Sequence, residues 1–319
     1  MRAHAVPPAE PTDSTIIHFK ATKRARLVPA EFTGSYTVPV PKSSAATSAS
    51  VQLVSRRARG TGRVLHLFSG PSGRIDGLSA FLRELGWECD EFDSKCNNDE
   101  AQNLADDTVW SALMQKIKSG YYDYIISGTP CETFSRARFV RPGPIPLRSV
   151  EHPYGLPGLS YEHKEQVRLG NLFAARTRDA CIAVVQAGGG YIMENPEPWE
   201  GYPSIWDLQE IKELQEKTGG SIMDIHQCPY GAETQKPTRL LYKKVKCEVL
   251  TARCKHPVRR WVDDKGKEYW APHPRSVQRK REDGSYATKA LGAWPRGLNK
   301  AFAILVNHAG PRIPYSGVQ

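Results

Sequence analysis

The stretch VLHLFSGPSG, residues 64–73, decides how the rest of the chain is interpreted. Its first five residues are apolar except for His66, which is typical of a buried strand, and a glycine-rich turn follows. Residues 77–85 then have the apolar spacing that predicts a helix. A strand that leads through a glycine turn into a helix is the opening unit of α/β folds with a mostly parallel sheet.

Strand and helix patterns continue to alternate after this unit. We therefore predict a Rossmann-like, doubly wound α/β fold whose mostly parallel sheet carries helices on both faces. The predicted strands are 64–68, 88–92, 122–127, 191–194, 221–227 and 239–243, and the predicted helices are 77–85, 107–118, 161–187, 204–217 and 296–308.

The chain has 319 residues, of which 39% are hydrophobic, so it can bury a core and is not wholly disordered. Residues 1–60, rich in Pro, Ser, Thr and Ala, are predicted to form a disordered basic arm. The α/β domain spans 61–243, a short basic insertion spans 244–290, and a C-terminal helix within 291–319 returns to the domain. No stretch reaches the roughly 18 apolar residues of a membrane span, so we expect no membrane partner, and we expect a monomer.

The formal net charge of +10 is unevenly distributed. Residues 1–63 hold 10 Lys or Arg and 3 Asp or Glu, residues 64–239 hold 17 and 25, and residues 240–300 hold 16 and 6. Basic flanks of this kind indicate nucleic acid as a partner, although a basic surface can also serve only for solubility. The C-terminal flank also contains aromatic residues suited to base stacking: Trp261, Tyr269, Trp270 and Tyr286.

The seven cysteines are odd in number and irregularly spaced, which argues against a disulfide framework and favours a reducing compartment. The N-terminus lacks the apolar segment of a secretory signal, and the basic clusters at 23–26 and 56–59 are either nuclear addresses or parts of a solvated tail. We therefore expect an intracellular protein, nuclear in a eukaryote. No metal site is predicted, because the C-terminal candidates fit no standard zinc spacing: Cys247, Cys254, His256 and His273.

A nucleotide-type cofactor is indicated by the glycine turn together with Glu91-Phe92-Asp93, about 20 residues downstream. A carboxylate at the end of the second strand holds the ribose hydroxyls of nucleotides in such folds. These two features do not separate a nicotinamide cofactor from S-adenosylmethionine, and the turn lacks the GxGxxG pattern.

Two turns carry chemically useful residues at the ends of predicted strands. Cys131 follows the strand 122–127, and Glu194 ends the strand 191–194. Because the carboxyl ends of parallel strands share one rim of a sheet, the two side chains are expected to meet there. A thiolate beside a carboxyl that donates a proton suits addition to an electron-poor ring. The alternatives are a small buried cysteine and a helix-capping or solvated glutamate.

Motifs between residues 64 and 242 resemble, in order and spacing, those of the DNA cytosine-5 methyltransferases. DYIISGTPCETFS at 123–135 is similar to the catalytic Pro-Cys motif of that family. RLGNL at 168–172 resembles the motif that opens the next helix, and Glu194-Asn195 resembles the Glu-Asn pair. QKPTR at 235–239 resembles the Gln-x-Arg-x-Arg motif.

The resemblance implies that 61–243 is an S-adenosylmethionine-binding catalytic domain and that 244–290 binds target DNA. In the implied mechanism, Cys131 adds to carbon 6 of a flipped-out cytosine, Glu194 acts at ring nitrogen 3 and Arg239 contacts the base carbonyl. The methyl group is then transferred to carbon 5. The implied catalytic residues are Cys131, Glu194 and Arg239, and the implied cofactor-binding residues are Phe68, Ser69, Gly70, Gly73, Glu91, Phe92, Asp106, Pro130 and Asn171.

The Pro- and Gly-rich loop at 136–161 resembles the mobile loop with which the family closes over the DNA backbone. Without the resemblance, the same loop would be interpreted as a surface insertion. Its arginines are Arg136, Arg138, Arg141 and Arg148.

The chain departs from the family pattern in four places. Pro196 follows the Glu-Asn pair where the family often has Val, and the region between Arg239 and the closing helix is shorter than the family's target-recognition domains. Pro237 stands where the family has the first Arg of Gln-x-Arg-x-Arg, and LGAWP at 291–295 stands where a Gly-Asn motif is expected. The alternatives therefore include an RNA cytosine-5 methyltransferase, a catalytically silent nucleic-acid-binding relative and a Rossmann oxidoreductase.

Overall fold

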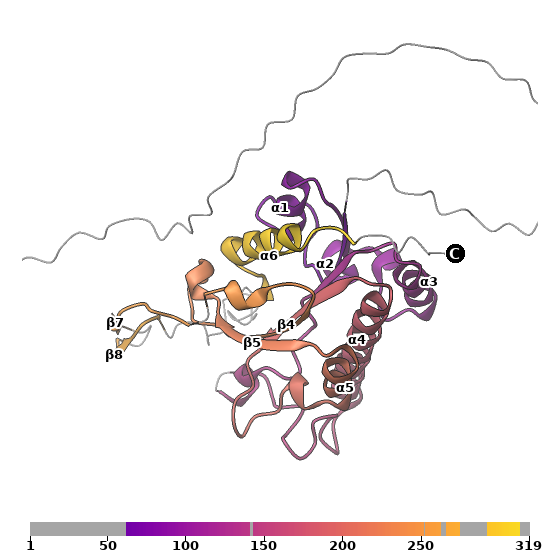
Figure 1. Ribbon diagram of the computed structural model, residues 1–319. Helices are drawn as coiled ribbons and strands as arrows, with labels where there is room; N and C mark the ends of the chain where they lie inside the picture. The colour runs from indigo at the N-terminus through magenta and orange to yellow at the C-terminus, as the bar shows by residue number, and fades with distance from the viewer. Residues whose placement is uncertain (1–61, 141–142, 252, 263–265, 275–291, 313–319) are drawn as a thin grey trace, which may run out of the picture. The chain divides into compact units, whose positions relative to one another are not determined.

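A computed structural model describes residues 62–140, 143–251, 253–262, 266–274 and 292–312 (Figure 1). The predicted arm at 1–60 lies outside the described residues, as do residues 275–290 of the basic insertion. Within the described part of the chain, no helix combines the length and the apolar character needed to cross a bilayer.

Six strands form the central sheet: β1 (Arg63–Leu67), β2 (Glu88–Phe92), β3 (Tyr124–Ser127), β4 (Gly190–Pro196), β5 (Ser221–His226) and β6 (Pro237–Lys243). Their order in the sheet is β2-β1-β3-β4-β6-β5. The first four are parallel neighbours, whereas β6 runs antiparallel to both β4 and β5. The sheet is mostly parallel, as predicted, and is compatible with a Rossmann-like fold.

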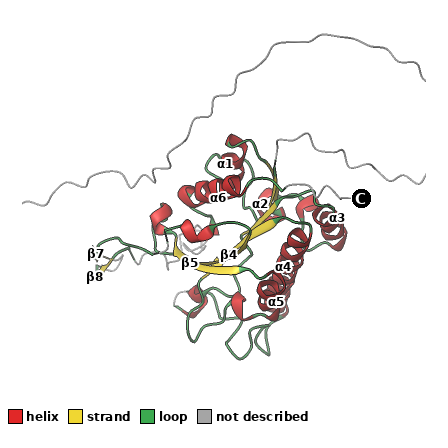
Figure 2. Cartoon of the chain, viewed as in Figure 1, coloured by secondary structure: helices red, strands yellow, loops and turns green. Residues whose placement is uncertain are grey.

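Helices cover both faces of this sheet (Figures 1 and 2). Val64 and Leu65 of β1 belong to two different core clusters, because successive residues of a strand point to opposite faces. The helices of the Val64 cluster are α1 (Leu78–Glu84) and α6 (Arg296–Ala309), and those of the Leu65 cluster are α3 (Asp107–Lys118), α4 (Tyr161–Gln186) and α5 (Gln209–Thr218). Covering on both faces explains why β1 and β3 are almost continuously apolar.

Three parts of the chain differ from the predicted elements. The predicted helix 204–217 is divided into a 3₁₀ turn at Ile205–Asp207 and α5, because the backbone of Leu208 between them is extended. In the basic insertion, where the sequence predicts no strand, β7 (Arg259–Val262) and β8 (Glu268–Ala271) form an antiparallel hairpin. A short helix, α2 (Ser94–Asn97), also follows β2.

Candidate active site

The turn after β3 presents Cys131 at the carboxyl rim of the sheet. β3 and β4 are parallel neighbours, so the residues that follow them share this rim. The side-chain amide of Asn195 donates a buried hydrogen bond to the Thr129 carbonyl oxygen at 2.7 Å. This bond ties the turn that carries Pro130 and Cys131 to the end of β4, where Glu194 lies.

Glu194 is buried, and nitrogen donors hold both of its carboxyl oxygens. Gln227 Nε2 donates to Oε1 at 3.1 Å, and Trp294 Nε1 donates to Oε2 at 2.9 Å. The Trp294 ring stacks on His66 of β1, with centroids 5.2 Å apart. Burial, and secondarily the charge of Arg74, lowers the pKa of His66 to about 3, so this imidazole is neutral. The orientation of the carboxyl is therefore fixed by residues from distant parts of the chain.

The half-buried Cys131 thiol is protonated at neutral pH. Burial first, and the Glu194 charge second, raise its pKa to about 11. The positive charge of Lys236 acts in the opposite direction and lowers the pKa of the thiol. Lys236 has a φ of 38°, in the left-handed region that non-glycine residues seldom adopt. The site thus contains a cation that the motif comparison does not assign.

Arg239 lies on the face of the sheet opposite to Glu194, contrary to the prediction that both contact one base. In the register of β4 and β6, Arg239 pairs with Asn195, the residue after Glu194. Paired residues point to the same face, and successive residues of a strand point to opposite faces. The Arg239 guanidinium forms a bidentate ion pair with Asp224 of β5, with distances of 2.7 and 2.9 Å. The structure therefore does not bring Arg239 to the Glu194 carboxyl.

The glycine turn after β1 is hydrogen-bonded to the end of β2. The backbone N–H groups of Phe68 and Ser69 donate to the Phe92 carbonyl oxygen at 2.8 and 3.3 Å. Gly70 and Gly73 both have a φ of 74°, and no non-neighbouring heavy atom lies within 4 Å of the position that a Cβ would take. The outer side of the turn is therefore open to the close approach of a ligand.

Two carboxylates lie beside this turn at the end of β2. Asp93 accepts the backbone N–H of Gly70 at 3.0 Å. Glu91 accepts the Ser79 hydroxyl at 2.8 Å, and the Arg83 guanidinium lies 3.6 Å from its second oxygen. Asp93 is thus the carboxylate that contacts the glycine turn, whereas the Glu91 carboxylate contacts α1.

Gly128 allows three separate segments to converge. A Cβ at this position would lie 3.2 Å from the Trp294 ring and 3.5 Å from the Phe68 carbonyl oxygen. The glycine turn, the Pro-Cys turn and the segment that precedes α6 therefore meet here. This contact joins the predicted cofactor site to the group formed by Cys131 and Glu194.

Asp106 and Asn171, two predicted cofactor-binding residues, make local contacts instead. Asp106 is the N-cap of α3, where it accepts two backbone N–H groups of the first turn at 2.8 and 2.9 Å, and these bonds lower its pKa. The Asn171 amide accepts from Arg148 at 2.7 Å and donates to the Tyr154 carbonyl at 3.1 Å. The described contacts of both side chains stabilise local structure and do not reach the glycine turn.

Arg148 is a buried brace between the loop and the helix that follows it. Its side chain is 1% exposed and lies over the Phe134 ring at 3.8 Å. The guanidinium donates to the Thr133 hydroxyl at 3.0 Å and to Asn171 Oδ1 at 2.7 Å. Arg148 therefore differs from a solvent-facing loop arginine, because these contacts hold its guanidinium inside the folded structure.

The other loop arginines have different surroundings. The Arg136 guanidinium lies 3.6 Å from the centre of the Trp199 ring. Arg138 donates to the Glu132 carbonyl oxygen at 2.7 Å, within the loop itself. Arg141 lies outside the described residues. Among the three described loop arginines, Arg136 therefore makes the fewest contacts with the loop backbone.

Three residues of the site were not predicted. Gln227 follows β5 directly, Trp294 lies in the LGAWP segment, and Lys236 lies between the matched residues of QKPTR. Each is adjacent to a motif or a strand end, which is the only signal the sequence offers for them. Their contacts depend on strand order and on the return of α6, which the motifs do not specify.

Four side chains of the types that ligate metals also gather at one point among the described residues. The ligand atoms of Cys228, Cys254, His256 and His273 all lie within 4.8 Å of one another. Cys247 is not in this group, because it is buried in the core cluster beside α1 and α6. Cys228, which stands apart from the other three residues in the sequence, completes this group of four.

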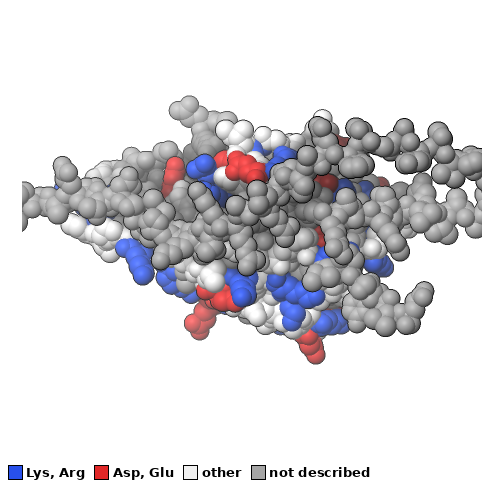
Figure 3. All heavy atoms as spheres, turned by 45° about the horizontal axis from the view of Figure 1, so that its top comes forward, with Lys and Arg blue, Asp and Glu red and all other residues white. Residues whose placement is uncertain are grey.

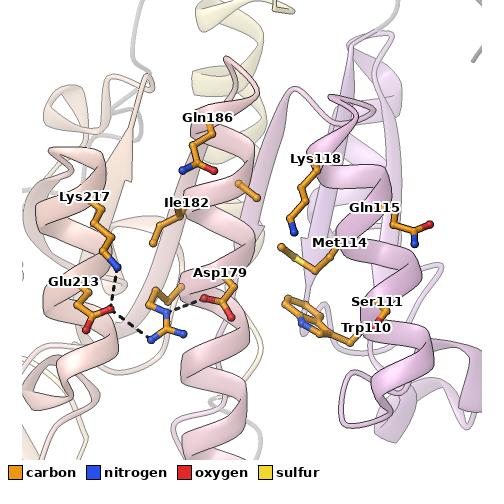
Figure 4. Close-up of a pocket in the computed structure, with 12 residues that line it drawn as sticks. Trp110, Ser111, Met114, Gln115, Lys118, Asp179, Ile182, Gln186, Glu213 and Lys217 are labelled. Carbon is orange, nitrogen blue, oxygen red and sulfur yellow. Dashed lines mark hydrogen bonds and ion pairs between the residues drawn. The ribbon is translucent and has the colours of Figure 1, made fainter.

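A surface hollow lies between α3, α4 and α5 (Figure 4). Trp110 and Met114 of α3 line one side. On the other side Glu213 of α5 lies 3.3 Å from Lys217 and 3.6 Å from Arg178. None of the predicted site residues lines this hollow. We therefore place the candidate active site at the ends of the strands and not in this hollow.

No protein-family model matches this chain, and no curated protein matches its sequence. The evidence for a function therefore comes from the residues of the site. The site combines a half-buried thiol, a buried carboxyl with two fixed donors and a nearby ammonium group at the rim where α/β sheets bind ligands.

Proposed function

We propose that the chain is an S-adenosylmethionine-dependent methyltransferase that modifies carbon 5 of cytosine in DNA through a covalent Cys131 adduct. The observation that carries this proposal is the convergence of Cys131, the braced Glu194 carboxyl and the glycine turn at one rim of the sheet. Addition to an electron-poor ring needs a thiol nucleophile and a proton donor in such an arrangement. The resemblance of the Pro-Cys and Glu-Asn motifs to the cytosine-5 methyltransferases supports the same chemistry.

The proposed reaction starts with a cytosine that has left the duplex stack, at a cost of roughly a few kcal/mol. The Cys131 thiol loses its proton to solvent and its sulfur bonds to ring carbon 6, while the neutral Glu194 carboxyl donates its proton at ring nitrogen 3 and takes it back when the product is released. The electron pair that reaches carbon 5 bonds to the methyl group of S-adenosylmethionine, and the carbon–sulfur bond of the sulfonium breaks to leave S-adenosylhomocysteine. Loss of the carbon-5 proton to a base and cleavage of the sulfur–carbon bond then release 5-methylcytosine and regenerate the thiolate.

The high pKa of Cys131 makes thiol deprotonation the step that its neighbours must assist. The Lys236 ammonium stabilises the thiolate electrostatically. Protonation of Glu194, or its pairing with the base, removes the negative charge that opposes the thiolate. Gln227 and Trp294 hold the carboxyl in position beforehand, so little reorganisation is needed when the base arrives.

The residues around the glycine turn fit a nucleoside-containing cofactor. Gly70 and Gly73 leave open space, and a side chain at either position would be strained at a φ of 74°. The half-buried carboxylate of Glu91 suits the hydroxyl groups of a ribose. S-adenosylmethionine bound there would supply an activated methyl group.

The charge and the aromatic groups of the basic insertion support a polyanionic substrate. Trp270 on β8 is 68% exposed, and the Arg259 guanidinium lies 4.5 Å from the centre of the Trp261 ring on β7. On the face drawn in Figure 3, Lys and Arg side chains and Asp and Glu side chains both reach the surface of the described residues. Cations next to exposed aromatic rings suit contacts with phosphates and bases.

Covalent trapping tests this proposal. Fluorine at carbon 5 cannot leave as a proton does, so the adduct at carbon 6 accumulates. The full chain is incubated with S-adenosylmethionine and DNA containing 5-fluorocytosine, beside Cys131→Ala and a control, Cys96→Ser, which changes an exposed cysteine. We expect a denaturation-resistant protein–DNA adduct with the unaltered chain and with Cys96→Ser, and none with Cys131→Ala.

The same experiment is repeated with RNA containing 5-fluorocytosine. An adduct on RNA alone would support the same covalent chemistry, with RNA in place of DNA as the substrate. Failure of the folded chain to form an adduct on either polymer would overturn the enzymatic proposal.

A further inference from the structure

A cluster of two cysteines and two histidines lies where the basic insertion meets the central sheet. Cys228 is the second residue after β5, Cys254 and His256 precede β7, and His273 follows β8. The Cys254 sulfur lies 3.3 Å from His256 Nδ1 and 3.3 Å from His273 Nε2. All four ligand atoms lie within 4.8 Å of one another. Residues far apart in the sequence therefore converge on one point.

The spacing of these atoms fits a tetrahedral metal ion. With Zn–S bonds of about 2.3 Å and Zn–N bonds of about 2.0–2.1 Å, the ligand atoms of a zinc site are about 3.3–3.8 Å apart. The two sulfur–nitrogen distances to Cys254 are at the lower end of that range. A single thiol proton can serve only one of the two imidazole nitrogens, whereas a shared cation satisfies both.

The surroundings of the cluster prepare its atoms for metal binding. His273 Nδ1 lies 3.1 Å from the Glu233 carbonyl oxygen, which can only accept a hydrogen bond. Nδ1 therefore carries the proton, and the lone pair of Nε2 faces the cluster. The backbone N–H of Cys254 donates to His226 Nδ1 at 3.0 Å, which positions the cysteine. A histidine ligand whose second nitrogen donates to a carbonyl is a common feature of zinc sites.

We infer that Cys228, Cys254, His256 and His273 bind one Zn²⁺ ion as a structural site. Two thiolates and two imidazoles in tetrahedral reach favour zinc over metals that prefer oxygen ligands. Four protein ligands leave no open coordination position, so the ion stabilises structure and does not activate a substrate.

The site attaches the β7–β8 hairpin to the end of the central sheet. Three of the ligands lie on the two sides of the hairpin, whereas Cys228 begins the 3₁₀ turn after β5 and follows Gln227, a partner of Glu194. A two-stranded hairpin is at best marginally stable by itself. The metal therefore fixes the base of a basic, aromatic hairpin next to the candidate active site. This inference does not depend on methyl transfer.

Metal analysis of the purified full chain tests the inference. We expect one zinc ion per chain by elemental mass spectrometry, and a dissociation constant raised more than about 100-fold in Cys254→Ser and His273→Asn, since even outer partners of zinc ligands are worth about 10–100-fold. Cys96→Ser changes an exposed residue and His163→Asn a half-buried one, both outside the cluster, and both variants should keep the metal. Equal zinc affinity in all five proteins would overturn the assignment.

Two measurements on the unaltered chain keep the inference testable if a ligand variant does not fold. Cobalt exchanged into the site should give the intense visible bands of tetrahedral Co²⁺ and a thiolate charge-transfer band. A chelator should speed tryptic cleavage in the hairpin, at Arg259, Arg260 or Lys267, and added zinc should reverse this. A spectrum of hydrated octahedral cobalt, with cleavage unaffected by the chelator, would contradict the site.

Discussion

Glu194 and Lys236 set the reactivity of Cys131 through opposite charges. Because the pKa of Cys131 is about 11, the thiolate fraction, and with it the alkylation rate, should rise about tenfold per pH unit between about pH 7 and 10. Glu194→Gln removes a negative charge and should lower that pKa. We expect iodoacetamide to alkylate Cys131 about tenfold faster at pH 8 in this variant, as measured by peptide mass spectrometry, while trapping by 5-fluorocytosine is lost.

Lys236→Met provides the opposite change for the same measurement. Loss of the ammonium group should raise the pKa of Cys131, so alkylation at pH 8 should slow. If both variants kept the alkylation profile of the unaltered chain, Glu194 and Lys236 would not act on the thiol, and the proposed site would be wrong.

At the residue scale, the sequence predicts the reactive side chains more accurately than it predicts which side chains contact one another. Cys131 and Glu194 stand in recognisable motifs at the ends of strands, so their shared rim could be expected. The face of Arg239 depends on its pairing with Asn195, and a shift of one residue would reverse it. Asp106 looks like a ligand-binding acid in the sequence, but the same residue type is favoured at helix N-caps.

At the scale of elements, Arg148 joins the loop after β3 to α4. Arg148→Met would leave the Thr133 hydroxyl and the Asn171 amide oxygen without their buried donor. We expect the free energy of unfolding to fall by about 2–4 kcal/mol, since each buried group left unpaired costs about 1–3 kcal/mol. Urea denaturation followed by circular dichroism measures this loss.

Arg168→Met is the matched control for the Arg148 variant. Arg168 lies on α4, the helix that Arg148 joins to the loop. Its side chain is well exposed and pairs with Glu165 at 2.7 Å. An exposed ion pair of this kind is worth about 0–1 kcal/mol, so little stability should be lost. Similar losses for the two variants would show that burial of Arg148 does not stabilise the loop.

Long, strongly patterned elements were the predictable part of the fold. The strand at 88–92 and the helix at 107–118 coincide with β2 and α3. β7 and β8 are four residues each and mostly exposed, so they show no apolar alternation that would predict them. The helix predicted at 204–217 is interrupted because the backbone of Leu208 is extended. The spacing of apolar residues does not reveal this change of backbone conformation.

At the scale of the whole molecule, both candidate sites are assembled from distant segments. Trp294 reaches Glu194 from 100 residues further along the chain, because α6 packs back onto the sheet. Cys228 meets His273 across 45 residues, because the hairpin returns to the end of β5. Motif spacing cannot predict such contacts. The charge pattern is informative at this scale, because an acidic α/β domain carries a basic insertion. The inferred zinc site would hold that insertion beside the candidate active site.

The position of a transferred methyl group tests the central claim most directly. Unmodified DNA is incubated with the full chain and methyl-deuterated S-adenosylmethionine, digested to nucleosides and analysed by mass spectrometry against standards. We predict label in 5-methyl-2′-deoxycytidine with the unaltered chain and none with Cys131→Ser. Label on the exocyclic nitrogen of cytosine or adenine, or 5-methyl-2′-deoxycytidine formed equally by Cys131→Ser, would contradict a covalent cytosine-5 mechanism.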